Sequence, residues 1–146
     1  MARLRKFSAY QNLERPYTRI SKYTKKNFVR GGFPHKKIVR FVMGTEKKYD
    51  TLIELTAGRS MNIRQEALES ARVVSNRYLE KILGKNFHLR LKVYPFHVLR
   101  ENPLASGAGA DRMSTGMKLS YGKTIGCAAR IGKGRPYLSY VWIRKM

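Results

Sequence analysis

The chain has 146 residues and carries 31 Lys and Arg against 9 Asp and Glu, a formal net charge of +22. Hydrophobic residues make up 42% of it, which excludes wholesale disorder and favours one compact domain. A free protein with this charge would repel itself, whereas a polyanion neutralises the charge and releases condensed counterions. Nucleic acid is therefore the expected partner, and an anionic membrane surface is the second choice.

Other features exclude several classes of protein. No apolar run approaches the roughly 20 residues that a membrane-spanning helix needs, and the first residues, MARLRKFSAY, lack the apolar core of a signal peptide. A single cysteine, Cys127, excludes an internal disulfide and a multi-cysteine zinc cluster. His35, His88 and His97 have no tight ligand spacing, so we expect surface or RNA-contacting imidazoles. We predict a buried thiol, a reducing cytoplasmic location, and no cofactor, metal, membrane or small-molecule partner.

Residues 1–36 interleave basic and aromatic side chains without a helical or strand period, and Gly31-Gly32-Phe33-Pro34 separates them from the rest of the chain. The pattern favours an extended arm that becomes ordered on RNA, with cations on phosphates and rings on bases or ribose. A solvated basic tail is the alternative. Under the first interpretation, the RNA-binding residues of the arm and of its junction with the body are Arg3, Arg5, Lys6, Arg15, Tyr17, Arg19, Lys22, Lys25, Lys26, Lys36 and Lys37.

The chain from residue 37 onward is expected to fold as a single domain. Residues 38–43 and 52–55 are β-prone runs on either side of a polar turn. A helix of about twenty residues is predicted next, with Asn62 as its N-cap, Gln65 completing a capping box and Gly84 just past its end. The predicted outward side includes two RNA-binding arginines, Arg64 and Arg72. The predicted core stripe is Ile63, Ala67, Ala71, Val74, Tyr78 and Ile82.

Residues 87–93, FHLRLKV, alternate between apolar and basic side chains. The alternation predicts a strand with Phe87, Leu89, Leu91 and Val93 in the core. His88, Arg90 and Lys92 would share the opposite face and form a second RNA surface, or else a basic strand face without a partner.

Three further strands are predicted at residues 97–100, 125–131 and 137–143, with a bend at Tyr94-Pro95 and a turn over residues 132–136. The fold class is therefore α+β, a mainly antiparallel β sheet backed by one long helix as a two-layer sandwich. No repeat or second domain is evident.

The stretch GAGADRMSTGMKLSYGKT, residues 107–124, ends like a phosphate-binding loop. The pattern G-x-x-x-x-G-K-[ST] would need a glycine at position 117, which is Met117. A strand rather than a helix is predicted to follow, so the sequence excludes a nucleotide-binding loop. Ser106, Ser114 and Thr115 cannot be assembled into a nucleophile with its base, so we predict no enzyme.

Residues 102–123 are instead expected to form a long loop of small residues. Glycines allow a backbone to approach a large surface closely, and Arg112, Lys118 and Lys123 give the loop positive charge. The composition suits insertion into a crowded RNA cleft, with Lys118 and Lys123 on RNA. A surface loop without a partner is the alternative.

Several segments, in this order along the chain, resemble the archaeal and eukaryotic ribosomal protein L ten-e, a branch of the universal ribosomal protein L sixteen family. The resemblance extends from about residue 15 to residue 130, and GAGADRMSTGM following YPFHVLREN is its most specific part. The matching segments are RPYTR (15–19), KIVRFVMG (37–44), IRQEALESARVVSNRYLEK (63–81), YPFHVLREN (94–102), GAGADRMSTGM (107–117) and YGKTIGCAAR (121–130).

The resemblance implies a structural constituent of the large ribosomal subunit, bound to its rRNA beside the path of the A-site tRNA. Its implied partners are large-subunit rRNA, A-site and P-site tRNA and neighbouring ribosomal proteins. The implied role supports tRNA positioning and subunit assembly, with a late-assembly checkpoint in eukaryotic relatives. Loop 102–123 would point toward the peptidyl-transferase centre and contact tRNA through Ser106, Gly107, Gly109, Asp111, Arg112, Met113 and Ser114.

Two positions depart from the family pattern. Thr124 stands where members commonly carry proline, and the chain ends at Met146, whereas archaeal relatives usually continue into a C-terminal helix on the sheet. We therefore expect either a shortened form or a sheet face covered by RNA or another chain. A free RNA-binding or RNA-chaperone protein outside the ribosome is the alternative function, because the charge alone would fit it.

Overall fold

The computed structural model describes residues 4–16, 18, 21–27, 29, 32–101 and 122–142. In this part of the chain a short 3-10 turn, η1, is followed by strands around one α-helix. The elements are η1 (Phe7–Ala9), β1 (Val42–Gly44), β2 (Thr51–Thr56), β3 (Met61–Arg64), α1 (Gln65–Leu83), β4 (Phe87–Leu91), β5 (His97–Glu101), β6 (Lys123–Ile131) and β7 (Pro136–Trp142). No helix of the described residues is long and apolar enough to cross a membrane.

The strands form two antiparallel sheets, one with the order β1-β4-β7-β2 and one with the order β3-β6-β5. This confirms the α+β class with antiparallel pairing. The single sheet expected from the sequence is divided in two, and the chain passes between the sheets after β2, through α1, after β4 and after β6. Pro95 lies in the crossing from β4 to β5, where it has no N–H to continue a strand ladder. Gly134, with φ +77°, lies in the crossing from β6 to β7.

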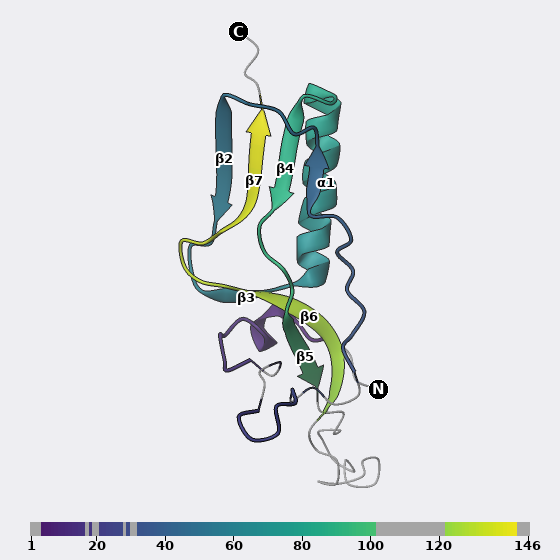
Figure 1. The fold of residues 1–146 in the computed structure, drawn as a ribbon, viewed down its shortest axis with the longest axis vertical. Coiled ribbons are helices and arrows are strands. Elements are labelled where there is room, and N and C mark those ends of the chain that lie inside the picture. Colours follow the sequence, from purple (N-terminus) through teal and green to yellow (C-terminus); the bar gives the residue numbers. More distant parts are fainter. Residues whose placement is uncertain are drawn as a thin grey trace.

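Figure 1 shows the two sheets following one another along the long axis of the molecule, with α1 beside the β4 side of the larger sheet. Main-chain bonds tie the crossing from β6 to β7 to the crossing from β2 to β3. Ala57 donates to the Arg135 carbonyl at 3.2 Å, and Gly134 donates to the Ala57 carbonyl at 2.8 Å. Both bonds fasten the β6–β7 crossing to one residue, Ala57.

The hydrophobic core lies between α1 and β4, and it continues into β6 and β7. The alternation predicted for residues 87–93 is confirmed, since Phe87, Leu89, Leu91 and Val93 are all buried. Burying a side chain of this size contributes about 1.5–3 kcal/mol. Gly44 ends β1 at φ +83°, where an added Cβ would collide with the Phe87 carbonyl oxygen, so only glycine fits there.

The predicted buried stripe of the helix is wrong. Val74 and Tyr78 are each 65% exposed and Ile82 is 59% exposed, whereas Leu68 is 1% exposed. Leu79 and Leu83 pack against the same core. The helix therefore carries two apolar stripes, and the one with leucines faces the sheet.

The predicted start of the helix is also wrong. Asn62 and Ile63 belong to β3, and α1 begins at Gln65 with Arg64 as its N-cap residue. The predicted end is confirmed, because Gly84 follows the helix at φ +60° and donates its N–H to the Glu80 carbonyl at 3.0 Å.

Candidate nucleic-acid interface

Residues 4–16 lie on the smaller sheet rather than apart from the body. Asn62 on β3 donates from Nδ2 to the main-chain carbonyl oxygens of Tyr10, at 2.8 Å, and Asn12, at 2.7 Å. Its main-chain N–H adds a bond to the Gln11 carbonyl at 3.3 Å. One buried asparagine thus holds three consecutive residues of the arm.

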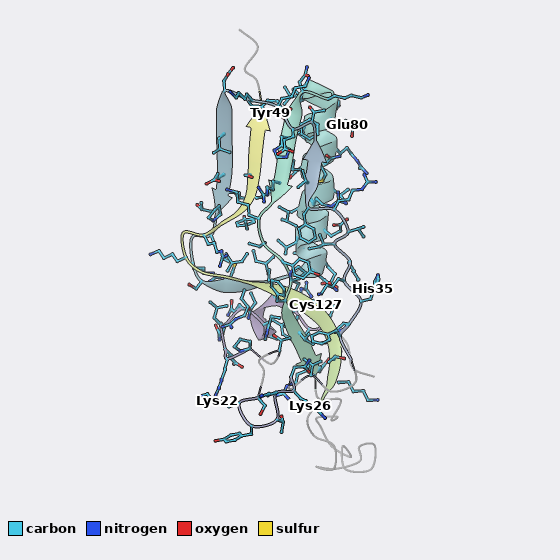
Figure 2. The ribbon with its side chains drawn as sticks, in the orientation of Figure 1. Lys22, Lys26, His35, Tyr49, Glu80 and Cys127 are labelled. Carbon is cyan, nitrogen blue, oxygen red and sulfur yellow. The ribbon has the colours of Figure 1, made fainter. Side chains whose placement is uncertain are left out.

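A compact turn presents three of the predicted RNA-binding lysines. The main-chain N–H of Ser21 donates to the Lys26 carbonyl at 2.8 Å, which closes the turn. Lys22, Lys25 and Lys26 are exposed, and Tyr23 is 96% exposed. Figure 2 shows Lys22 and Lys26 near the lower end of the molecule, the opposite end from Tyr49. We call residues 21–26 the basic turn; cations and exposed rings are the kinds of side chain with which proteins contact phosphates and stack on bases.

Other predicted RNA-binding cations have acidic partners within the chain. Arg5 is paired with Glu101, Lys92 with Glu54, and Lys37 with Glu66 at 3.3 Å. The Arg5 and Lys37 side chains remain 62% and 57% exposed, so both can still reach a phosphate. Surface pairs of this kind contribute about 0–1 kcal/mol, and a polyanion competes with them easily.

Arg64, at the end of β3, and Arg72, on α1, take structural positions. Arg64 donates from its guanidinium to the Arg5 carbonyl at 3.0 Å and so helps to hold the arm. Arg72, expected to point outward, is largely buried beside Glu69, with Nε 2.9 Å from the carboxylate Oε2. The hydrogen bond lowers the pKa of Glu69 and raises the pKa of Arg72, in each case against the effect of burial.

Some of the remaining predicted RNA-binding residues lie in the described part of the chain and others lie outside it. Lys6, Arg15, Arg90 and Lys123 are exposed, and Lys36 and His88 are half-buried. Strand alternation places His88 and Arg90 on one face of β4, as predicted. Outside the described residues lie Arg3, Tyr17, Arg19, Lys118 and the loop residues Ser106, Gly107, Gly109, Asp111, Arg112, Met113 and Ser114.

A group of three aromatic rings that the sequence analysis did not select joins Phe41, just before β1, to Tyr94 and Phe96, between β4 and β5. Phe41 stacks on Tyr94 with ring centroids 5.3 Å apart, and Phe96 tilts against Tyr94 at 4.5 Å. Lys36 places its Nζ 4.5 Å from the Tyr94 ring centroid. Phe96 is 70% exposed, so its ring can stack on a base while Lys36 supplies charge. The Tyr-Pro-Phe sequence was the available signal for the rings, but no sequence pattern places Lys36 beside them.

Cys127 is buried, as predicted, and burial raises the pKa of its thiol. Among the residues that the structure describes, no three His, Cys, Asp or Glu side chains are grouped to hold a metal ion. Figure 2 shows Cys127 near the middle of the molecule, where the two sheets meet.

A family model described as ribosomal protein L16p/L10e matches residues 18–141. The chain is similar to the large ribosomal subunit protein uL16 of Methanoculleus marisnigri, with 47% identity over 122 residues, 82% of this chain and 71% of the relative. The protein of that name from Archaeoglobus fulgidus is 40% identical over 137 residues, 92% of this chain and 74% of the relative. The protein of the same name from Thermoplasma volcanium is 46% identical over 121 residues, which is 80% of this chain and 68% of the relative.

Proposed function

The chain belongs to the L16p/L10e family of ribosomal proteins, and on that premise we propose that it is a structural constituent of the large ribosomal subunit. The observation that carries the proposal is the family match over residues 18–141, together with the net charge of +22. The same charge needs a polyanion to neutralise it, and large-subunit rRNA supplies one. The relatives are named as ribosomal proteins, and the proposed role needs no catalytic group.

Two surfaces support binding to rRNA. The basic turn offers Lys22, Lys25, Lys26 and an exposed tyrosine ring. Lys36 and the exposed Phe96 ring offer a second combination of charge and stacking surface. Both combine sequence-independent phosphate contacts with stacking, which suits RNA whose unpaired bases are accessible.

The finer part of the proposal concerns loop 102–123. We infer from the family resemblance that this loop faces the peptidyl-transferase centre beside the A-site tRNA, where it supports tRNA positioning and subunit maturation. Ser106, Arg112 and their neighbours would contact RNA, while docking of the protein depends on the body and arm. Its further partners in the subunit are neighbouring ribosomal proteins, and the subunit works in the cytoplasm.

The loop claim is tested by deleting residues 106–114 or replacing Arg112 by alanine. We expect either change to reduce translation or slow subunit maturation, while the protein still joins the subunit. Equal loss of docking on deletion of the loop would show that the loop is the anchoring surface and would contradict the assignment.

The alternative is a free RNA-binding or RNA-chaperone protein. Sedimentation of the native chain in magnesium-containing gradients distinguishes it from a ribosomal constituent. A ribosomal constituent sediments with large subunits. An RNA chaperone appears mainly in slowly sedimenting fractions and binds many RNAs in a salt-sensitive way.

A further inference from the structure

The crossing from β2 to β3 and the crossing from β6 to β7 together form one exposed patch of positive charge. We call residues 57–60 and 132–135 the crossing patch; their sequences are AGRS and GKGR, and neither contains an acid. Arg59, Lys133 and Arg135 are exposed, and none of them has an ion-pair partner in the described part of the chain. Figure 1 shows the two crossings running side by side at the left edge of the molecule.

Hydrogen bonds fix the main chain of the crossing patch. Ala57 is buried, and its main-chain N–H and carbonyl are both bonded to the other crossing. The main-chain N–H of Lys133 donates to Ser60 Oγ at 3.0 Å. Residues 132–135 form a turn closed by a main-chain bond of 3.2 Å, and Gly134 has φ +77°, as in a type II turn. The exposed cations therefore project from a main chain that is held in place.

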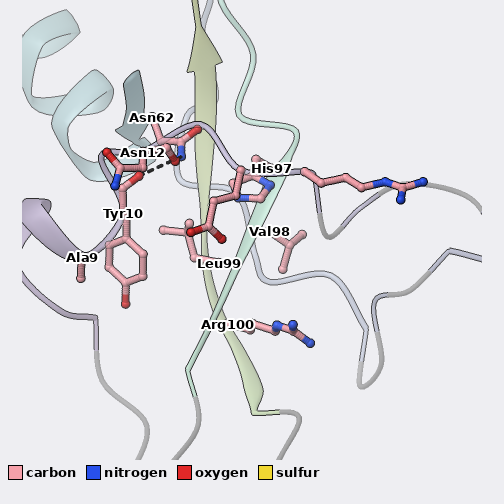
Figure 3. A pocket seen from close by; sticks show the side chains of 10 residues that line it. Ala9, Tyr10, Asn12, Asn62, His97, Val98, Leu99 and Arg100 are labelled. Atoms are coloured by element: carbon pink, nitrogen blue, oxygen red, sulfur yellow. Dashed lines mark hydrogen bonds between the residues drawn. The ribbon is translucent and has the colours of Figure 1, made fainter. Parts of the chain in front are cut away.

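The arm borders the crossing patch through an aromatic ring. Arg59 places its guanidinium carbon 6.0 Å from the centroid of the Phe7 ring. Phe7 belongs to the arm, and Asn62 ties the arm to β3 through the carbonyls of Tyr10 and Asn12. Figure 3 shows these last three residues together, with a dashed line from Asn62 to the arm. A guanidinium held near a ring still offers the N–H groups of its edge to an anion.

The crossing patch also offers a hydroxyl donor and room for a close approach. Ser60 accepts the Lys133 N–H through its hydroxyl oxygen, so its own hydrogen remains able to donate. Gly58 and Gly132 are exposed, and a Cβ added to either of them would meet no atom within 4 Å. A large ligand can therefore touch the main chain at these two positions.

The composition of the crossing patch favours a phosphodiester backbone over a protein surface as its ligand. The core of a protein–protein interface is apolar and rich in aromatic side chains, and lysine is depleted there. Ala57 is the one apolar side chain of the crossing patch, and it is only 4% exposed. Arginine, lysine and serine side chains are donors that contact phosphate oxygens, and such contacts carry no sequence information.

We propose that the crossing patch is a further rRNA site, which binds the phosphates of one RNA strand without reading its sequence. Arg59, Lys133 and Arg135 donate to phosphate oxygens, and Ser60 adds its hydroxyl hydrogen. The two exposed glycines let the sugar–phosphate backbone lie directly against the protein. The inference rests on the proposed function, because its ligand is the rRNA of the large subunit.

The direct test is a structure of the large subunit containing the full chain. The proposal requires rRNA phosphate oxygens within about 2.7–3.2 Å of side-chain nitrogens of at least two of the three cations. Acidic side chains of a neighbouring protein on these cations, or solvent alone, would overturn it. A chain absent from the subunit would instead contradict the proposed function, so the two failures can be told apart.

Hydroxyl-radical cleavage of the rRNA backbone tests the contact in solution, in large subunits that carry the full chain. The test variant combines Arg59→Gln, Lys133→Gln and Arg135→Gln. The control removes three exposed cations at the end of the molecule that carries Tyr49 (Figure 2), and it combines Lys47→Gln, Lys48→Gln and Lys85→Gln. We expect cleavage at one short run of nucleotides to rise several-fold in the test variant alone. The same cleavage pattern in both variants would contradict the site.

A second variant keeps the charge of the crossing patch and removes only the room beside it. Gly58→Leu adds a side chain where the protein itself leaves space, and Asn86→Leu adds one at an exposed position next to Lys85 as the control. We expect the same run of nucleotides to become accessible in subunits with Gly58→Leu and to stay protected in the control. Protection that persists with Gly58→Leu would overturn the direct contact between the crossing patch and the rRNA.

Discussion

Asn62 Nδ2 lies 2.7 Å from the main-chain oxygen of Asn12, and this bond joins the arm to β3, an edge strand of the smaller sheet. Replacing Asn62 by leucine leaves the Tyr10 and Asn12 carbonyls without that donor. We expect a loss of about 1–3 kcal/mol in the free energy of unfolding and faster proteolysis within residues 4–16. The control is Asn86→Leu, at an exposed asparagine. Equal proteolysis of the two variants would contradict the anchoring role.

The helix face is tested by two truncations of similar size. Leu68 is 1% exposed and Ile82 is 59% exposed. Leu68→Ala should therefore cost about 2–5 kcal/mol in the free energy of unfolding through the cavity that it leaves. Ile82→Ala should cost much less, because its side chain already meets solvent. Denaturant unfolding measures both values. A larger loss for Ile82→Ala than for Leu68→Ala would favour the buried stripe predicted from the sequence.

The Glu69–Arg72 pair predicts a pH-dependent contribution to stability. The pKa of Glu69 is lowered below its ordinary value of 4.5, mainly by the hydrogen bond from Arg72. A lowered folded-state pKa stabilises the protein above the unfolded pKa, and the stabilisation is lost as the pH falls through the folded value. Glu69→Gln should thus lower stability at pH 7 by at most about 1 kcal/mol.

The difference between wild type and Glu69→Gln should shrink as the pH is lowered below 4.5. Glu80→Gln, at an exposed position of the same helix, serves as the control for removing one negative charge. Thermal unfolding across the pH range measures the difference. A difference for Glu69→Gln that stays constant at low pH would show that charge pairing is not its cause.

The basic turn predicts a change in the salt dependence of RNA binding. Lys22→Gln with Lys26→Gln removes two exposed cations, whereas Lys47→Gln with Lys48→Gln removes two exposed cations beside Tyr49, at the opposite end. We expect the first pair to weaken rRNA binding and to reduce the slope of log K against log salt by about 0.7–0.9 per lost phosphate contact. The same change from the second pair would show only a general charge effect.

Local pattern and tertiary packing explain which expectations the structure confirmed. The alternation over residues 87–93 fixes the inward face of β4. Side chains alternate between the two faces of a strand, and only the face that carries Phe87 and Leu89 is apolar. The helix carries two apolar stripes of comparable length. Which one becomes buried depends on the surface of β4 that meets it, and this lies in no single segment of the sequence.

The wrong prediction of Asn62 as a helix N-cap shows a second limit of prediction from the sequence. Asparagine before a helical pattern favours an N-cap, but here its amide binds two carbonyls fifty or more residues earlier in the chain. The division into two sheets has the same origin, since strand pairing across Pro95 and Gly134 is decided by long-range contacts. For the candidate site, composition predicted the exposed lysines of the basic turn. Spacing could not bring Lys36 to the Tyr94 ring or reveal the internal partner of Arg72.

The most direct test of the central claim is ultraviolet cross-linking of the native chain in cells, followed by sequencing of the attached RNA. A constituent of the large subunit predicts that most cross-linked reads map to large-subunit rRNA at a few discrete positions. Replacing Lys22 and Lys26 should deplete some of those positions. Reads spread over many cellular RNAs in proportion to their abundance would contradict the account and favour a free RNA-binding protein.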